Sequence, residues 1–191
     1  MMPRKTMAGI AFILTLGICA GAQDDKLVVD FAQKGIEKQI RGNAPNNTKE
    51  GAEFIISDGA KGKVLDVKCI PNSLHVYPGV SIDFDPPLDF SKFGRIEVDL
   101  TNYSQEEIIF CLRVDNAGYW QTEPWNTEQK IIQPGRSGTV AVHFGYSWGK
   151  PGFKLDPSKI VSLMLFVSKP KTERFFRIER IRATGKPGDK P

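Results

Sequence analysis

The chain has 191 residues, of which 40% are hydrophobic, 10% aromatic and 25% charged. This length suits one globular domain, and the many apolar residues exclude a disordered tail protein. The formal net charge is +4, from 26 basic and 22 acidic residues, an excess too small to indicate nucleic acid as a partner.

The N-terminus has the layout of a secretory signal peptide. Arg4 and Lys5 precede an uncharged apolar stretch from Met7 to Cys19, and Ala20-Gly21-Ala22 supplies small residues for cleavage. The apolar stretch is shorter than the ~20 residues that span a membrane, so an uncleaved anchor is the less favoured alternative.

These features predict three segments: a signal peptide (1–22), a single domain (23–184) and a flexible tail (185–191). Cleavage removes two basic residues and leaves a net charge of +2. We therefore expect a secreted, periplasmic or cell-surface protein, with no membrane insertion after cleavage.

The mature chain reads as a succession of short strands. Apolar alternation, interrupted by Gly, Pro, Asn and Asp, predicts strands over 27–31, 53–56, 63–70, 80–84, 95–100, 108–114, 138–144, 160–167 and 175–181. The polar stretch 34–50 is expected to be a long loop. This pattern predicts an all-β fold, a two-sheet antiparallel β-sandwich.

Two cysteines remain after cleavage, and export permits a disulfide between them. Cys69 shares a strand face with Leu65 and Val67, which directs it to the core. Cys111 falls with Arg113 on the opposite face of its strand. This placement argues against a bridge, although it does not exclude one.

Aromatic residues gather in two predicted loops. Tyr119, Trp120 and Trp125 lie among Asn, Gln and Pro, and Trp148 lies among Gly and Ser. Large apolar side chains held at a loop rim indicate a binding site. The alternative is a small satellite core that closes the end of the sandwich.

Sugars suit such a rim, because pyranose C–H groups stack on aromatic faces while the hydroxyls need polar partners. Arg113, Asn116, Gln121 and Asn126 are placed in the sequence to supply those partners. No catalytic motif accompanies them, so catalysis is not expected.

A calcium site is a further hypothesis. Asp30 ends the first predicted strand, and Glu179 lies in the last one, where the apolar spacing from Ile178 to Ile181 predicts a bulge. Calcium takes hard oxygen ligands and would link the two strands. Alternatively, Glu179 simply pairs with a neighbouring arginine.

Three segments, 88–102, 155–167 and 176–181, resemble secreted carbohydrate-binding modules. Together they are similar to galactose-binding-like jelly rolls, particularly the non-catalytic modules that precede agarase catalytic barrels. The resemblance implies a jelly roll, often with one structural calcium, that binds an oligosaccharide or polysaccharide at an open face or loop edge.

The sequence therefore predicts a secreted, stand-alone, non-catalytic carbohydrate-binding protein, with a separate glycoside hydrolase as a possible partner. One alternative is a structural or protein-interaction domain of the cell envelope. Another is a small polysaccharide-cleaving enzyme.

Overall fold

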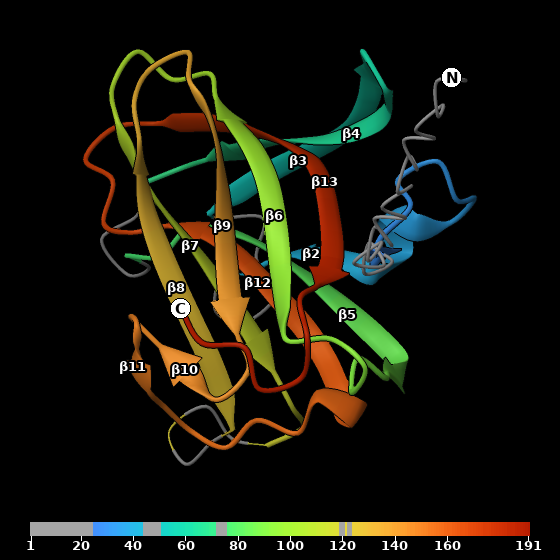
Figure 1. Ribbon diagram of the computed structural model, residues 1–191. Coiled ribbons are helices and arrows are strands. Elements are labelled where there is room, and N and C mark those ends of the chain that lie inside the picture. The colour runs from blue at the N-terminus through green and yellow to red at the C-terminus, as the bar shows by residue number, and fades with distance from the viewer. Residues whose placement is uncertain (1–24, 44–50, 72–75, 119–120, 122–123) are drawn as a thin grey trace, which may run out of the picture.

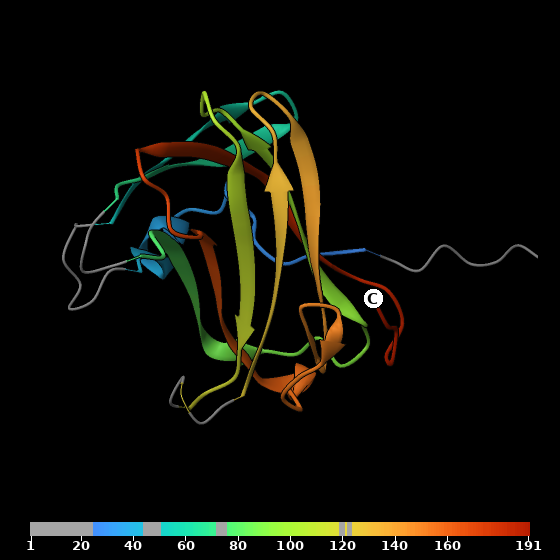
Figure 2. The same cartoon turned by 90° about the vertical axis from the view of Figure 1, so that its left-hand side faces the viewer.

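The computed structural model describes residues 25–43, 51–71, 76–118, 121 and 124–191. Its strands form two antiparallel sheets packed face to face, as the ribbon views show (Figures 1 and 2). The predicted all-β sandwich is thus confirmed. The predicted signal peptide lies outside the described residues. Among the residues that are described, no helix is long and apolar enough to cross a membrane.

The first sheet, sheet A, has the order β3-β4-β13-β6-β9, with β1 also paired to β13. Its strands are β1 (Lys26–Leu27), β3 (Ala52–Gly59), β4 (Gly62–Cys69), β6 (Arg95–Asn102), β9 (Ser137–His143) and β13 (Arg174–Thr184). The register of β13 against β6 shifts between Ile178 and Arg180, which confirms the predicted bulge at Glu179.

The second sheet, sheet B, has the order β2-β5-β12-β7-β8. Its strands are β2 (Ile40–Gly42), β5 (Gly79–Leu88), β7 (Ile108–Asp115), β8 (Trp125–Ile132) and β12 (Ile160–Val167). A small ribbon of β10 (Tyr146–Ser147) and β11 (Lys150–Pro151) lies beside β8 (Figure 1). Short 3-10 turns, Ile36–Gln39 and Pro157–Lys159, precede β2 and β12.

Alternation along each strand builds the core. In β6, Ile96, Val98 and Leu100 are fully buried, while Arg95 and Asp99 face outward. Rings from the two sheets meet edge to face, with the centroids of Phe110 and Phe176 5.2 Å apart. The largest fully buried side chains come from both sheets and, in the case of Phe90, from the connection between β5 and β6: Phe90, Phe110, Phe176, Leu65, Ile82, Ile96, Leu100, Ile108, Leu112, Ile160, Leu163 and Leu165.

The structure adds strands that the sequence pattern does not reveal. β8 falls where no strand is predicted, and β2 lies inside the stretch 34–50 that is predicted to be one long loop. Both are edge strands of sheet B, and β8 exposes or half-exposes most of its residues. An edge strand that buries few side chains carries little apolar alternation to detect.

Both cysteines are buried free thiols on different sheets. Cys69 points into the core from β4, and Cys111 lies on the outer side of β7. Burial raises the pKa of each thiol to about 12, so the reactive thiolate is scarce at neutral pH.

The segment after β13, expected to be a flexible tail, lies against the domain. The carboxylate of Asp189 pairs with the Arg95 guanidinium at 3.2 Å and accepts the Lys186 backbone N–H at 2.8 Å. The backbone of Lys186 passes so close to Gly94 that a Cβ there would lie 2.2 Å from the Lys186 carbonyl oxygen.

A network of charges stabilises the outer face of sheet A. Arg182 on β13 pairs with Glu97 and Asp99 on β6, and Glu97 also accepts from Arg95 at 2.6 Å. Burial by itself would raise the pKa of Glu97, but the hydrogen bonds from Arg95 and Arg182 outweigh burial and hold that pKa below its ordinary value of 4.5.

This network predicts a pH-dependent cost for Glu97→Gln. A lowered pKa in the folded state means that the Glu97 carboxylate stabilises the fold above about pH 5, and that this stability is lost as the pH falls below the ordinary pKa. At pH 7 we expect the variant to lose about 1–3 kcal/mol of unfolding free energy. Urea denaturation at pH 7 and pH 3 should show the difference shrinking at the lower pH. The exposed Glu37→Gln is the control, and an equal loss at both pH values would contradict the role of the charge.

Candidate functional site

The outer face of sheet B carries the residues that could meet a ligand. The strand register places Trp125 beside Asp115, Asp115 beside Ser162, and Ser162 beside Asp83. Arg113 lies two residues before Asp115 on β7, so its side chain is on the same side of the sheet. We call this outward surface the sheet B face and define it by Trp125, Asp115, Arg113, Asp83 and Arg41.

Trp125 is the centre of an aromatic cluster at one end of the sheet B face. Its ring centroid lies 5.9 Å from that of Trp148 and 5.3 Å from that of Phe153, and both pairs meet edge to face. The guanidinium of Arg113 lies 5.0 Å from the Trp125 centroid. We call Trp125, Trp148 and Phe153 the aromatic cluster. The positive charge of Arg113 lies beside it.

The outer members of this cluster are open to solvent. Trp148 is 54% exposed and Phe153 is 39% exposed, whereas Trp125 is half-buried between them. A sandwich closed by a satellite core would hide these rings. Exposed rings next to one another form instead a surface available for contact.

Trp148 is held in a backbone conformation that favours glycine. Its φ is 51°, in the left-handed region, and Gly149 follows with a φ of 69°. The Trp148 N–H donates to the Thr127 carbonyl at 3.0 Å, which fixes the turn to β8. Keeping a large ring at a position where glycine is less strained suggests that the ring has a function.

The charges on the sheet B face occur as balanced pairs. Arg113 Nε donates to Asp115 at 2.8 Å, and Arg41 Nε donates to Asp83 at 2.5 Å. Burial raises the pKa of Asp115 even though Arg113 opposes the shift. The second carboxylate oxygen of Asp115 is buried and has no hydrogen-bond partner among the described residues.

Two predicted sugar-binding amides have another role. Asn126 is fully buried, donates to the Phe153 carbonyl at 3.0 Å and accepts the Gly145 N–H at 2.7 Å. Asn116 donates to the carbonyl oxygens of Asp156 and Lys159 at 2.8 and 2.7 Å. These hydrogen bonds hold loops together, and the reading of hydroxyls by these amides stays a prediction from the sequence. Asn126 does, however, position Phe153 in the aromatic cluster.

Of the remaining predicted ligand residues, the structure describes only Gln121 of the loop between β7 and β8. Gln121 is exposed in a turn between β7 and β8. Tyr119 and Trp120 lie outside the described residues. Phe153 was missed by the sequence reasoning, although its place between Gly152 and Lys154 in a predicted loop resembles the setting that singled out Trp148.

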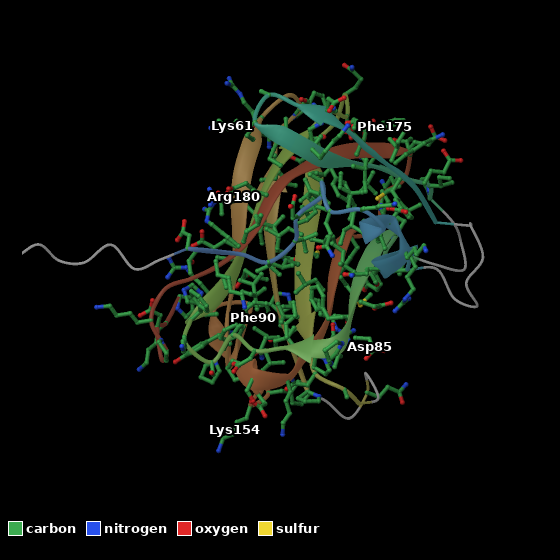
Figure 3. All side chains as sticks on the ribbon, turned by 90° about the vertical axis from the view of Figure 1, so that its right-hand side faces the viewer. Lys61, Asp85, Phe90, Lys154, Phe175 and Arg180 are labelled. Carbon is green, nitrogen blue, oxygen red and sulfur yellow. The ribbon has the colours of Figure 1, made fainter. Side chains whose placement is uncertain are left out.

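The predicted calcium ligands line one hollow of about 800 Å³ on another side of the molecule, together with Lys61 and Arg180 (Figure 3). Asp30 accepts the Ala32 N–H at 2.9 Å, and Glu179 accepts from the Thr101 hydroxyl at 3.2 Å. Among the residues that the structure describes, no group of three or more His, Cys, Asp or Glu is arranged to hold a metal. Calcium binding by Asp30 and Glu179 stays a prediction from the sequence.

Neither a family model nor a curated protein sequence matches this chain. Solved structures do match. An exo-β-agarase has a TM-score of 0.64 and 17% identity over 86% of this chain, but only 25% of its own length is covered. This chain therefore spans about a quarter of the agarase that it resembles.

Isolated modules match over nearly their whole length. The family 11 carbohydrate-binding module of Clostridium thermocellum, solved with a β-1,3-1,4-mixed-linked tetrasaccharide, has a TM-score of 0.59 and 18% identity, covering 88% of this chain and 99% of its own. A xylan-binding domain of family 22 has a TM-score of 0.50 and 17% identity, covering 87% and 97%. The chain is thus a β-sandwich that resembles carbohydrate-binding modules, including those that accompany agarases.

Proposed function

We propose that this protein is an exported, non-catalytic carbohydrate-binding protein that recognises an oligosaccharide or polysaccharide on the sheet B face. One observation carries the proposal: Trp148 and Phe153 are exposed on either side of Trp125, which Arg113 contacts from the same face. The resemblance to carbohydrate-binding modules supports it.

The chemistry of the face suits a sugar. The rings of the aromatic cluster offer apolar planes for pyranose C–H groups, and the Arg113 guanidinium, which Asp115 holds in place, lies beside them as a donor for hydroxyls. The ion pairs leave the face without a large excess of either charge, as a ligand rich in hydroxyls requires. Hydrogen bonds to sugar largely replace hydrogen bonds to water, so each contributes modestly to affinity.

The same geometry favours binding over cleavage. A glycosidase needs two carboxyl groups that flank the glycosidic bond and stay free to exchange protons. On this face, Asp115 is held by Arg113 and Asp83 is held by Arg41. Such carboxylates suit hydroxyl recognition. The agarase likeness also supports a role beside a glycoside hydrolase, which this protein would keep near its substrate.

The backbone strain at Trp148 allows a sharp test. In Trp148→Gly the ring is lost, but a left-handed residue is replaced by the one that tolerates this φ best. We expect retention on immobilised polysaccharide to fall at least about tenfold, equivalent to ~1.4 kcal/mol. The unfolding free energy should change by no more than about 1 kcal/mol, because relief of strain offsets lost contacts.

Lys169→Gly is the matched control, since Lys169 also has a positive φ, of 46°, and lies outside the aromatic cluster. It should keep full retention. Affinity electrophoresis in agarose, mixed-linked β-glucan and xylan would measure both variants. Full retention by Trp148→Gly would refute the aromatic cluster as the site, and no retention of the unmodified protein on any glycan of a broad array would favour a protein-interaction domain.

Arg113→Lys tests the polar part of the site. Lysine keeps the charge but loses the planar guanidinium that contacts Trp125 and donates to Asp115. We expect oligosaccharide affinity, measured by tryptophan fluorescence titration, to fall about fivefold, or ~1 kcal/mol. The exposed Arg136→Lys should behave like the unmodified protein, and an unchanged affinity for Arg113→Lys would show that the charge alone suffices.

A further inference from the structure

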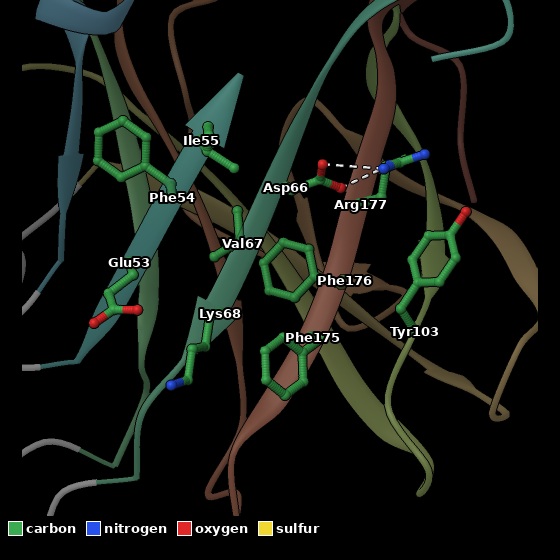
Figure 4. A pocket seen from close by; sticks show the side chains of 10 residues that line it. All are labelled: Glu53, Phe54, Ile55, Asp66, Val67, Lys68, Tyr103, Phe175, Phe176 and Arg177. Atoms are coloured by element: carbon green, nitrogen blue, oxygen red, sulfur yellow. Dashed lines mark hydrogen bonds and ion pairs between the residues drawn. The ribbon is translucent and has the colours of Figure 1, made fainter. Parts of the chain in front are cut away.

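A second aromatic surface lies on the outer face of sheet A. A groove of about 420 Å³ is lined from β3, β4 and β13 and by Tyr103, which follows β6. The register aligns Glu53, Lys68 and Phe175 across three strands, and the Tyr103 N–H donates to the Phe175 carbonyl at 2.9 Å. Figure 4 shows these residues in the groove, which we call the sheet A groove.

Large apolar side chains are exposed along this groove. Ile55 is 65% exposed, Tyr103 53% and Phe175 41%. Ile55 and Phe175 are on the outward sides of β3 and β13, Tyr103 follows β6, and none of the three belongs to the core between the sheets. Three exposed apolar side chains that line one groove are more than scattered surface residues and indicate a contact site.

Charged groups accompany the two rings. The Arg177 guanidinium lies 5.1 Å from the centroid of Tyr103, and Lys68 Nζ lies 5.9 Å from the centroid of Phe175. Both cations are also held by carboxylates, Arg177 by Asp66 at 2.7 Å and Lys68 by Glu173 at 2.9 Å. The rings are thus bordered by fixed donors and acceptors, as the aromatic cluster on sheet B is by Arg113 and Asp115.

The size of the groove selects among occupants. A stable protein interface buries about 800 Å² on each partner and involves about 20–30 residues a side. Compact ligands occupy pockets of about 300–1,000 Å³. The sheet A groove is lined by ten described residues, fewer than such an interface involves, and its volume is in the range of compact ligands. Its few exposed rings with paired charges match a ligand that has apolar faces and a hydroxylated rim.

We propose that the sheet A groove is a second glycan-binding site, which takes a short segment of a polysaccharide by stacking on Tyr103 and Phe175. The choice of ligand rests on the proposed function. Arg177, Lys68 and Glu53 supply the donors and the acceptor for the hydroxyls of that segment.

The two sites belong to different sheets and lie far apart. In Figure 3, Phe175 is near one end of the molecule, and Lys154, the neighbour of Phe153, is near the other. A short oligosaccharide therefore occupies one site at a time, whereas a polymer or a bundle of polymers engages both. Simultaneous engagement raises retention on a polymer by an avidity factor of about 10²–10⁴ without a new contact at either site.

No tryptophan is among the described residues that line the groove, which separates the two sites experimentally. The variant Tyr103→Ala/Phe175→Ala should lose at least about tenfold in retention on immobilised polysaccharide, because avidity is lost. Fluorescence titration with a tetrasaccharide of the same glycan, agarose or mixed-linked β-glucan, follows the tryptophans and should give an unchanged affinity. Leu27→Ala, which removes a side chain 47% exposed on β1, is the control.

Each other outcome overturns the inference. If the double variant is folded by urea denaturation and is fully retained, the groove does not bind glycan, although loss of binding in Trp148→Gly would still uphold the proposed function. If no variant changes retention, both proposals fail. If the unmodified protein self-associates in sedimentation and only the double variant is monomeric with full retention, the groove is a protein contact.

Discussion

The pairing register of β7 is the constraint on which the proposed binding surface depends. β7 pairs without a shift with β8 on one side and β12 on the other. Because side chains alternate, this register sends Phe110, Leu112 and Val114 to the core and Arg113 to the sheet B face. A slip of one residue would exchange the two sets, so the core that stabilises the sandwich also fixes the contact between Arg113 and Trp125.

Outside the paired strands, buried polar side chains hold the loops in place by hydrogen bonds. Asn126 ties the loops of Gly145 and Phe153 together, and Asn116 anchors the segment before β12. Substituting either amide would be costly, because buried carbonyl and N–H groups would lose their hydrogen-bond partners. The strained backbone of Trp148 is then held in place by its surroundings, as the proposed role of Trp148 in recognition requires.

The outer faces of the two sheets share a chemical pattern but differ in how it is built. On sheet B, the aromatic side chains come from a strand and from the ribbon and loop beside it. On sheet A, Phe175 comes from β13 and Tyr103 from the residues that follow β6, next to the Arg177–Asp66 pair. In both places ion pairs fix the polar groups before any ligand arrives, which lowers the ordering cost of binding.

The sequence alone determined the all-β class, most of the core strands and the bulge at Glu179, because these follow from local alternation of apolar residues. It also singled out Arg113, Trp125 and Trp148, since aromatic and charged residues stand out among Gly, Asn and Pro. Only the tertiary structure decided that β8 is a strand, that Asn116 and Asn126 face inward, and that Phe153 joins the aromatic cluster. The physical reason is that edge strands and loop contacts are set by partners far away in the chain, whereas alternation records only which face of a strand is buried.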